Sequence, residues 1–364
     1  MPPARRSSGK TQGTARAADP LASLQRRYEK ALRAEIERTV GAADLPLYRM
    51  MRYHLGMGEA SAPPGEVPPP RAGGGKMLRP LLCLLCCEAV GGDYRRALPA
   101  AAALELLHNF TLVHDDIEDA SPSRHGRQTV WRVWGQAQAI NVGDGLYALA
   151  HLALLRLGEV GVSAEVAVET ARLLDEASLR VCEGQHLDIA FEERLDVGSG
   201  EYLEMVAGKT VALLGSAAAL GALLGEAPAP AVTAFREFGR ELGFAFQIRD
   251  DILGIWGESV ETGKPAGEDI LARKKSFPVV YAFEQAVGPD REALLAAYGK
   301  SSLGPDDLAT VGSILERTGA LAFSEEAARR HAAEALTHLD GLELVPARRR
   351  ELESFAAYVA ERRR

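Results

Sequence analysis

The chain is poor in cysteine, in aromatic residues and in strand-like patterns. Its 364 residues include four cysteines, and aromatic side chains make up 6% of them. Four cysteines are too few for a disulfide scaffold at this length, which predicts reduced thiols in a cytoplasmic protein. An unbroken apolar run of about 18 residues is not evident, so the sequence predicts no membrane span.

Positive charge is also in deficit. The chain has 42 Lys and Arg against 50 Asp and Glu, a net charge of −8. A nucleic-acid partner would need a basic face, so this balance argues against one. A phosphorylated small molecule needs only a local cationic cluster or metal ions and stays possible. Residues 1–18 hold four basic residues and no acid, which predicts a disordered basic tail.

Helical periodicity fills most of the remaining chain, residues 19–364. The strongest patterns span 78–90, 94–119, 136–157, 164–190, 201–224, 231–254, 306–317, 320–340 and 346–362. Some of them, such as 210–224, are apolar around much of the helix, which is typical of helices inside a bundle. The predicted fold is therefore all-α: one large helical bundle with a central cavity.

The first acidic cluster lies at the C-terminal end of one of these apolar helices. Residues 114–119 read His-Asp-Asp-Ile-Glu-Asp, and the four-residue spacing puts Asp115 and Asp119 on one face, with Asp116 beside them. Crowded carboxylates repel one another unless positive charge offsets them. Mg²⁺ prefers such oxygen ligands and commonly bridges them to substrate phosphates. The alternative interpretation is a solvated acidic helix end.

A second acidic cluster, Asp250 and Asp251, closes another apolar helix. Two aspartate pairs facing each other across a bundle could hold Mg²⁺ ions around an anionic ligand. Gly254 stands where a further aspartate would complete a DDxxD motif, so this side offers fewer ligands.

Cationic residues accompany both clusters. Lys76 and Arg79 follow a glycine turn at a helix start, a place that suits a phosphate group. Lys209 lies within an apolar helix, where a lone lysine is costly without an anion. Singly, each lysine is typical of a solvated surface. The other cations are Arg124, His125 and Arg127 after the first cluster, and Lys264, Lys274 and Lys275 after the second.

In their order along about residues 20–363, these motifs resemble the trans-isoprenyl diphosphate synthases of the polyprenyl synthetase family. The segments on which this resemblance rests are GGGKMLRP, LELLH, DDIED, INVGD, EGQHLD, AGKTVALL, FQIRDD and GKPAGEDILARKK. The resemblance implies a prenyltransferase of the isoprenoid synthase fold. It condenses isopentenyl diphosphate with an allylic diphosphate, and about three Mg²⁺ ions assist. It also implies a homodimer.

The resemblance assigns roles to residues. The residues that it implies for binding isopentenyl diphosphate are Gly75, Lys76, Arg79 and His108, and His125 stands where the family usually has a second arginine. Those implied for binding the allylic diphosphate, or for lying beside it, are Arg124, Lys209, Thr210, Gln247, Lys264 and Lys274. The implied metal ligands are Asp115, Asp119 and Asp250. The implied catalytic residues are these three together with Asp116, Arg124, Lys209, Asp251 and Lys264.

Product length is expected to follow the depth of the cavity. Phe110 precedes Asp115 by five residues, about one and a half turns deeper, and with Thr111 it narrows the predicted cavity. An aromatic residue there without an insertion in DDIED resembles the geranylgeranyl type, which makes a 20-carbon product. Alternatively, Phe110 is a core residue and other helices set the length, as in a farnesyl or longer-chain synthase.

Two further functions compete with this interpretation. A class I terpene synthase on the same fold would ionise an allylic diphosphate without needing Lys76, Arg79 and His108. A non-catalytic partner subunit would tend to lose aspartates, and the first cluster is intact.

Three smaller features have plain interpretations. Cys83, Cys86 and Cys87 lack a matching second pair and predict packed core thiols. Trp131 and Trp134 predict core or subunit packing. The final residues, Arg362–Arg364, predict a solvated tail or, as a minor alternative, a basic end that closes over the second diphosphate.

Overall fold

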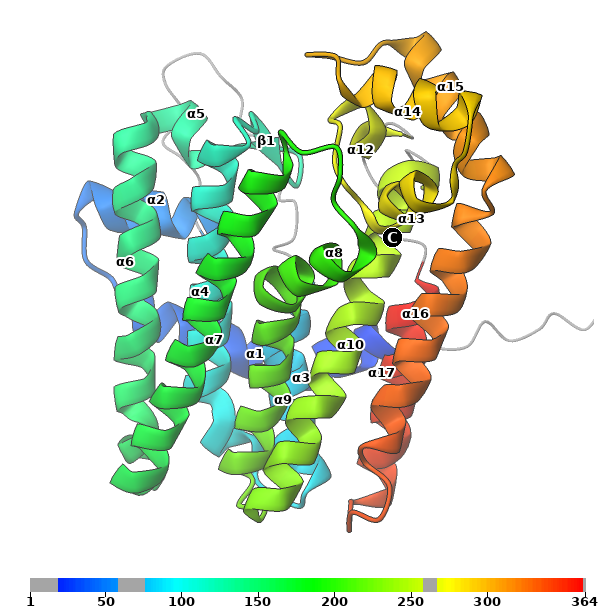
Figure 1. Cartoon of the computed structure of the whole chain (residues 1–364). Coiled ribbons are helices and arrows are strands. Elements are labelled where there is room, and N and C mark those ends of the chain that lie inside the picture. The colour runs from blue at the N-terminus through cyan, green and yellow to red at the C-terminus, as the bar shows by residue number, and fades with distance from the viewer. Residues whose placement is uncertain (1–18, 58–75, 258–266, 363–364) are drawn as a thin grey trace, which may run out of the picture.

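The computed structural model describes residues 19–57, 76–257 and 267–362, and these are almost entirely helical (Figure 1). The predicted all-α fold is confirmed. The predicted basic tail and the site residues Gly75 and Lys264 lie outside the described residues. A short antiparallel ribbon pairs the strands β1 (Ser123–Arg124) and β2 (Arg127–Gln128).

The helices follow the predicted patterns closely and add several short ones. In chain order they are α1 (Pro20–Val40), α2 (Pro46–His54), α3 (Leu78–Ala89), α4 (Tyr94–Glu118), α5 (Val130–Trp134), α6 (Gln136–Leu155), η1 (Arg156–Val160), α7 (Ala164–Phe191), α8 (Ser199–Val206), η2 (Ala207–Val211), α9 (Ala212–Leu224), α10 (Ala229–Trp256), α12 (Glu268–Leu271), α13 (Phe277–Gln285), α14 (Pro289–Tyr298), α15 (Pro305–Arg317), α16 (Ala320–Thr337) and α17 (Pro346–Glu361).

The long helices form one bundle. Helix α4 packs on α6, α10 packs on α9 and α16, and α3 lies against α4 and α9. Helix α1 crosses behind the bundle, and the shorter α12–α15 gather over one end of it (Figure 1). The main core holds α3 and the alanine-rich middle of α4, where Ala100–Ala103 are fully buried. Helices α4 and α10 therefore run beside the core and end at the same end of the bundle (Figure 1).

The predicted core thiols are confirmed. Cys83, Cys86 and Cys87 are buried and free, and burial raises the pKa of each thiol. Helix α9 approaches this stretch of α3 so closely that a Cβ on Gly221 would lie 2.2 Å from the carbonyl oxygen of Cys83. These cysteines therefore serve helix packing.

The helix that runs through α8, η2 and α9 bears on the prediction that the chain has no membrane span. Residues Ser199–Leu224 are long and apolar enough to cross a membrane, although the sequence predicted no such segment. However, 78% of the apolar window is buried inside the fold. It is therefore a core helix of the bundle, surrounded by other helices rather than by lipid.

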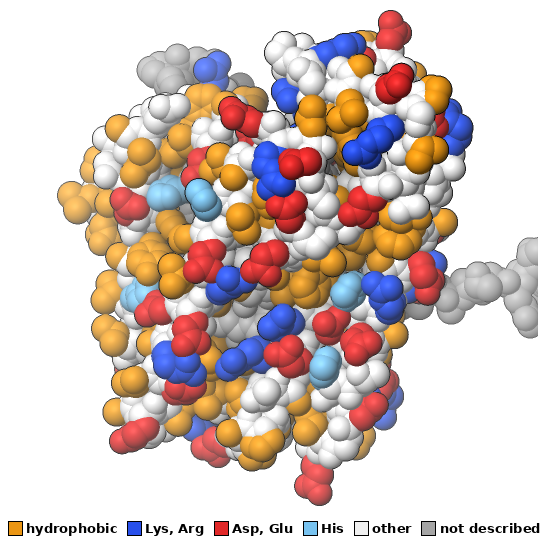
Figure 2. Space-filling model, viewed as in Figure 1, with side chains coloured by type: hydrophobic (Ala, Val, Ile, Leu, Met, Phe, Trp, Pro, Cys, Tyr) orange, Lys and Arg blue, Asp and Glu red, His pale blue; other side chains and the backbone are white. Residues whose placement is uncertain are grey.

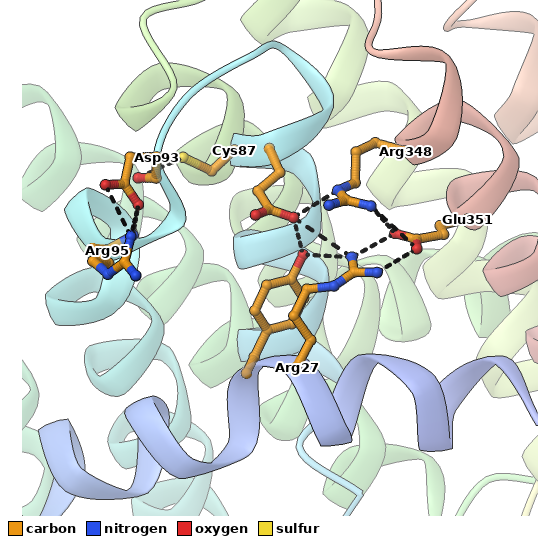
Figure 3. Close-up of polar contacts among 8 residues, drawn as sticks. Arg27, Cys87, Asp93, Arg95, Arg348 and Glu351 are labelled. Carbon is orange, nitrogen blue, oxygen red and sulfur yellow. Dashed lines mark hydrogen bonds and ion pairs between the residues drawn. The ribbon is translucent and has the colours of Figure 1, made fainter.

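A network of partly buried charges ties the C-terminal helix to the N-terminal half (Figure 3). Arg27 on α1 donates to Glu351 on α17 with its Nη1 2.7 Å from Oε2. Arg348 donates from Nε to Glu88 of α3 at 2.6 Å, and the Tyr28 hydroxyl donates to the same carboxylate at 2.7 Å. The backbone N–H of Val345 donates to the Ala89 carbonyl oxygen at 2.8 Å. These bonds fix the start of α17, and with it the place where the helix ends.

Candidate active site

A cavity of about 1090 Å³ opens between the helix ends that carry the two aspartate clusters. Both polar and apolar side chains line it. Nearly all of the predicted site residues line it: Lys76, Arg79, His108, Phe110, Thr111, Asp115, Asp116, Asp119, Arg124, His125, Lys209, Thr210, Gln247, Asp250, Asp251 and Lys274. The fold thus gathers, around one cavity, residues that are far apart in the sequence.

The first aspartate cluster is held by cations of the chain. Arg124, on the β1–β2 ribbon, lies 2.8 Å from Asp116 Oδ1 through Nε and 3.3 Å from Asp115 Oδ2 through Nη2. Asp116 is 1% exposed, and burial raises its pKa to about 6 although Arg124 opposes the shift. Asp115 and Asp119 lie nearer the solvent, so they are the carboxylates that face the mouth.

Lys209 lies in a local distortion of its helix. The predicted helix 201–224 contains a π-helical turn, η2, and such turns are frequent at functional sites. A Cβ on Gly184 of α7 would lie 2.0 Å from the Lys209 backbone nitrogen, so only glycine permits this approach. Lys209 forms ion pairs with Asp188 and with Asp115, the latter at 3.4 Å. Burial lowers the Lys209 pKa, but these carboxylates outweigh it and raise the value.

The two residues of the second aspartate cluster lie in different environments. The Asp250 side chain is 41% exposed and faces the cavity. Asp251 is buried, and its carboxylate accepts hydrogen bonds from the Tyr202 hydroxyl at 2.5 Å, the Phe277 backbone N–H at 2.7 Å and the Gln247 amide at 2.9 Å. Burial raises the Asp251 pKa to about 7. Asp251, which the sequence placed in the catalytic set, thus joins α10 to α8 and α13.

The structure gives a reason for the glycine in the second motif. A Cβ on Gly254 would lie 1.9 Å from Asp269 Oδ2. The Asp269 carboxylate, from α12, therefore occupies the space that a longer side chain at position 254 would need. Its Oδ1 lies 4.0 Å from Lys274 Nζ. A carboxylate is thus present beside this turn of α10, supplied from another helix.

A separate cationic pocket lies at the start of α3. Met77 adopts φ of 51°, which turns the chain into the helix and sets Lys76 at the cavity wall. Arg79 Nη1 lies 3.1 Å from His108 Nε2. Burial lowers the Arg79 pKa to about 10, and burial and Arg79 together hold the His108 pKa well below its ordinary value. Neutral His108 therefore accepts from Arg79, and the guanidinium stays charged at neutral pH.

His125 lies at the tip of the β1–β2 turn with φ of 52° and lines the cavity. Burial, with Arg124 and Lys76 nearby, lowers its pKa. This environment favours the neutral ring, which can still donate an N–H.

Phe110 lies in the cavity wall beneath the first cluster, half-buried. Its ring centroid is 4.9 Å from that of His114 and 5.2 Å from that of Tyr147 on α6. Thr111 also lines the cavity and donates its hydroxyl hydrogen to the His108 carbonyl oxygen at 2.7 Å. Trp131 and Trp134 pack as predicted, the first donating to the Ser121 carbonyl oxygen at 2.8 Å.

Sequence reasoning missed two contributors to the cavity, and its main interpretation of a third was wrong. Glu105 of α4 and His54 of α2 line the cavity, and neither belongs to a charged cluster in the sequence. Arg362 is 6% exposed and lies 2.5 Å from Asp250 Oδ1 through Nη2, so it is not part of a solvated tail. Arg363 and Arg364 lie outside the described residues. Only contact with α10 could have revealed the place of Arg362.

The carboxylates suit a hard metal ion that shares its ligands with a substrate. Among the described residues, no three His, Cys, Asp or Glu side chains lie close enough together to hold an ion by themselves. Mg²⁺ commonly keeps several waters and binds through one or two carboxylates plus phosphate oxygens. Asp115 and Asp250, on facing helix ends, fit that ligand set.

Two carboxylate-bearing helix ends and a cationic pocket thus meet at one cavity of a helical bundle. The family model described as Polyprenyl synthetase matches residues 71–315. The chain belongs to the polyprenyl synthetase family, whose members include trans-prenyl diphosphate synthases.

Its relatives differ in the product that their names give. The (2E,6E)-farnesyl diphosphate synthase of Mycobacterium tuberculosis is 37% identical over 318 residues, which cover 86% of this chain and 85% of the relative. A geranylgeranyl diphosphate synthase of the same organism is 43% identical over 248 residues, 68% of each chain. A solved polyprenyl synthase from Caulobacter crescentus, complexed with calcium and isoprenyl diphosphate, matches with a TM-score of 0.82 and 27% identity, covering 97% of this chain and all of that one.

Proposed function

We propose that this chain condenses isopentenyl diphosphate with an allylic diphosphate and releases geranylgeranyl diphosphate. The observation that carries the proposal is the pairing of two anion sites in one cavity. The cations Lys76 and Arg79, with His108, line the same cavity as the carboxylates Asp115 and Asp250. A reaction between two diphosphates needs two such sites, whereas a terpene synthase needs one.

The chain's own residues would orient the substrates. Arg79 and Lys76 hold the diphosphate of isopentenyl diphosphate, with neutral His108 fixing the guanidinium. This places the double bond against the allylic carbon and saves the entropy of bringing the two together. The apolar wall, which includes Phe110, Val181 and Leu213, excludes water from the reacting carbon.

Charge would drive the ionisation step. The allylic C–O bond breaks and its electron pair leaves with the diphosphate, while Arg124 and Lys209 supply fixed positive charge beside it. The isopentenyl double bond attacks the cation, and a proton then passes to the departed diphosphate. Lys264 and Lys274 are proposed to assist, with Thr210 and Gln247 holding each other at 2.7 Å beside the cavity.

Mg²⁺ is the proposed cofactor, with about three ions when the substrate is bound. Asp115, Asp119 and Asp250 would hold them, and bound ions would neutralise the charge that develops on the leaving diphosphate. The calcium in the Caulobacter crescentus relative supports a divalent ion in this family.

Phe110 is proposed to set the product at 20 carbons. Its ring narrows the cavity about one and a half turns below Asp115 and is backed by Tyr147. Thr111, next along the helix, contributes to the same wall.

The chain is further proposed to be a cytoplasmic homodimer. Hydrophobic side chains gather at the left edge of the surface in Figure 2, over α6. The exposed ones on α6 and the neighbouring α7 include Leu152, Leu155, Val168 and Leu179. A patch of this kind marks an interaction surface. Sedimentation at equilibrium tests the dimer, and a monomer mass would contradict it. The free cysteines support the cytoplasm.

The deciding experiment is an assay with Mg²⁺, isopentenyl diphosphate and each of dimethylallyl, geranyl and farnesyl diphosphate. The products are dephosphorylated and separated by chromatography. We expect a linear 20-carbon alcohol. A linear alcohol of another length would reject the role of Phe110 alone, and a cyclic hydrocarbon formed without isopentenyl diphosphate would reject chain elongation.

A further inference from the structure

The last described residue of the chain, Arg362, contacts the second aspartate cluster. Arg362 follows the end of α17, and its Nη2 lies 2.5 Å from Asp250 Oδ1. The same Nη2 donates to the Phe246 carbonyl oxygen at 3.2 Å, and the guanidinium carbon lies 4.0 Å from the centre of the Phe246 ring. Arg249 Nε donates back to the Arg362 carbonyl oxygen at 2.7 Å. Arg362 therefore contacts the turn of α10 that carries Asp250 through hydrogen bonds, an ion pair and a ring contact.

Burial distinguishes the two side chains. The Arg362 side chain is 4% exposed, whereas that of Asp250 is 41% exposed. Both residues line the cavity, but the guanidinium is packed into the protein and the carboxylate is open to solvent. A metal ion entering the cavity would therefore meet an Asp250 carboxylate that Arg362 already holds by one oxygen.

Distant contacts keep Arg362 in this place. Helix α17 has 16 residues, a length of about 24 Å. Its first end is fixed to α3, because the Val345 N–H and the Arg348 side chain both bond to residues of that helix. A helix clamped at one end delivers the residue after its other end to a defined position. The contact is therefore a feature of the bundle and not of a free tail.

We propose that Arg362 is a positioning residue for metal binding: it fixes Asp250 through Oδ1 and leaves the second oxygen to the ion. This rests on the proposed function, which makes Asp250 a metal ligand. Groups that hydrogen-bond to a metal-ligating carboxylate orient it, and losing one typically weakens metal affinity 10- to 100-fold. In this role, the arginine acts on the aspartate and does not bind a substrate diphosphate.

The test measures binding of Mn²⁺ to the full chain in the presence of inorganic pyrophosphate, by electron paramagnetic resonance, with Mn²⁺-pyrophosphate alone subtracted. Arg362→Met removes the charge and keeps an apolar chain against Phe246. Arg362→Lys keeps the charge. Arg350→Met, at an exposed position on the same helix, is the matched control. Asp250→Ala is the reference for loss of the ligand itself.

We expect Arg362→Met to raise the apparent Kd for Mn²⁺ about tenfold, Arg362→Lys to recover part of that loss, and Arg350→Met to match wild type. Melting temperatures in EDTA separate positioning from folding. Equal or tighter Mn²⁺ binding by Arg362→Met would overturn the proposal, even if that variant melts earlier, because the arginine would then be structural or a competitor of the metal.

The same data distinguish failure of the proposed function. If wild type and Asp250→Ala bind Mn²⁺ equally, Asp250 is not a ligand and the metal site itself is wrong. If Asp250→Ala weakens binding and Arg362→Met does not, only the positioning role is wrong. Should Arg362→Met fail to fold, Arg362→Lys decides: a Kd for Mn²⁺ between those of wild type and Asp250→Ala supports the positioning role, and a Kd equal to or lower than that of wild type contradicts it.

Discussion

The two aspartate clusters look alike in the sequence but are built differently in the structure. At the end of α4, Asp115 and Asp119 both face the mouth, and Arg124 and Lys209 lie beside them. Near the end of α10, Asp250 is open to solvent, whereas Asp251 is buried and its carboxylate accepts from Tyr202, Phe277 and Gln247. The difference shows that a repeated pair of carboxylates does not imply a repeated role: packing around each helix end decides which oxygen atoms stay available.

The largest effect is expected from a substitution that disrupts the first cluster. Asp115→Ala should lower kcat about a thousandfold, because it removes a proposed metal ligand that also pairs with Arg124 and Lys209. Circular dichroism and the melting temperature should stay close to wild type, since the Asp115 side chain is at the mouth. Steady-state kinetics check this, and activity within tenfold of wild type would refute the assignment.

The next prediction compares the aromatic residues beneath the two clusters. Phe110→Ala should lengthen the product, because it opens the cavity below Asp115. Phe246→Ala is the comparison variant. Phe246 also lines the cavity, one turn before Asp250, and packs on Arg362, and we expect the product length to stay unchanged because Phe110 is the residue proposed to set it. Chromatography of dephosphorylated products gives both answers. The same spectrum from wild type and Phe110→Ala would show that another helix sets the length.

Restoring the missing aspartate sharpens the comparison further. Gly254→Asp completes a DDxxD motif, yet we expect it to destabilise the protein by about 1–3 kcal/mol, because its Cβ meets the Asp269 carboxylate. Denaturant unfolding measures this. Asp269→Gly added to Gly254→Asp should recover stability. If Gly254→Asp alone were as stable as wild type, Asp269 would not fill that space.

The smallest effect concerns pH. Burial raises the Asp251 pKa from an ordinary value of 3.8 to about 7. The folded state therefore holds a proton that the unfolded chain releases, and stability from this residue is full below about pH 4 and lost as pH rises through about 7. Asp251→Asn should reduce the fall in unfolding free energy between pH 5 and pH 8. An unchanged fall, measured by denaturant titration, would assign it to other groups.

Much of the fold was predictable because long helices carry their own signal. The predicted helix 164–190 is α7 and 231–254 is α10, each within two residues, since apolar periodicity over many turns leaves little choice. The short helices α2, α5, α13 and α14 were not predicted as separate elements, because so few turns give a weak periodicity. The π-helical turn at Lys209 also escaped prediction, since it depends on a glycine of α7.

The sequence by itself determined the all-α class, the two aspartate clusters, the cationic segments and the family. Each of these is written in local spacing or in a contiguous motif. Only the tertiary structure decided that Asp251 is buried among hydrogen-bond donors, that Asp269 fills the space beside Gly254, and that Arg362 pairs with Asp250. The physical reason is that burial and ion pairing depend on which helices meet. Residues on different helices carry no mark of each other in a single sequence, whether they lie near in the chain, as Gly254 and Asp269 do, or far apart, as Asp250 and Arg362 do.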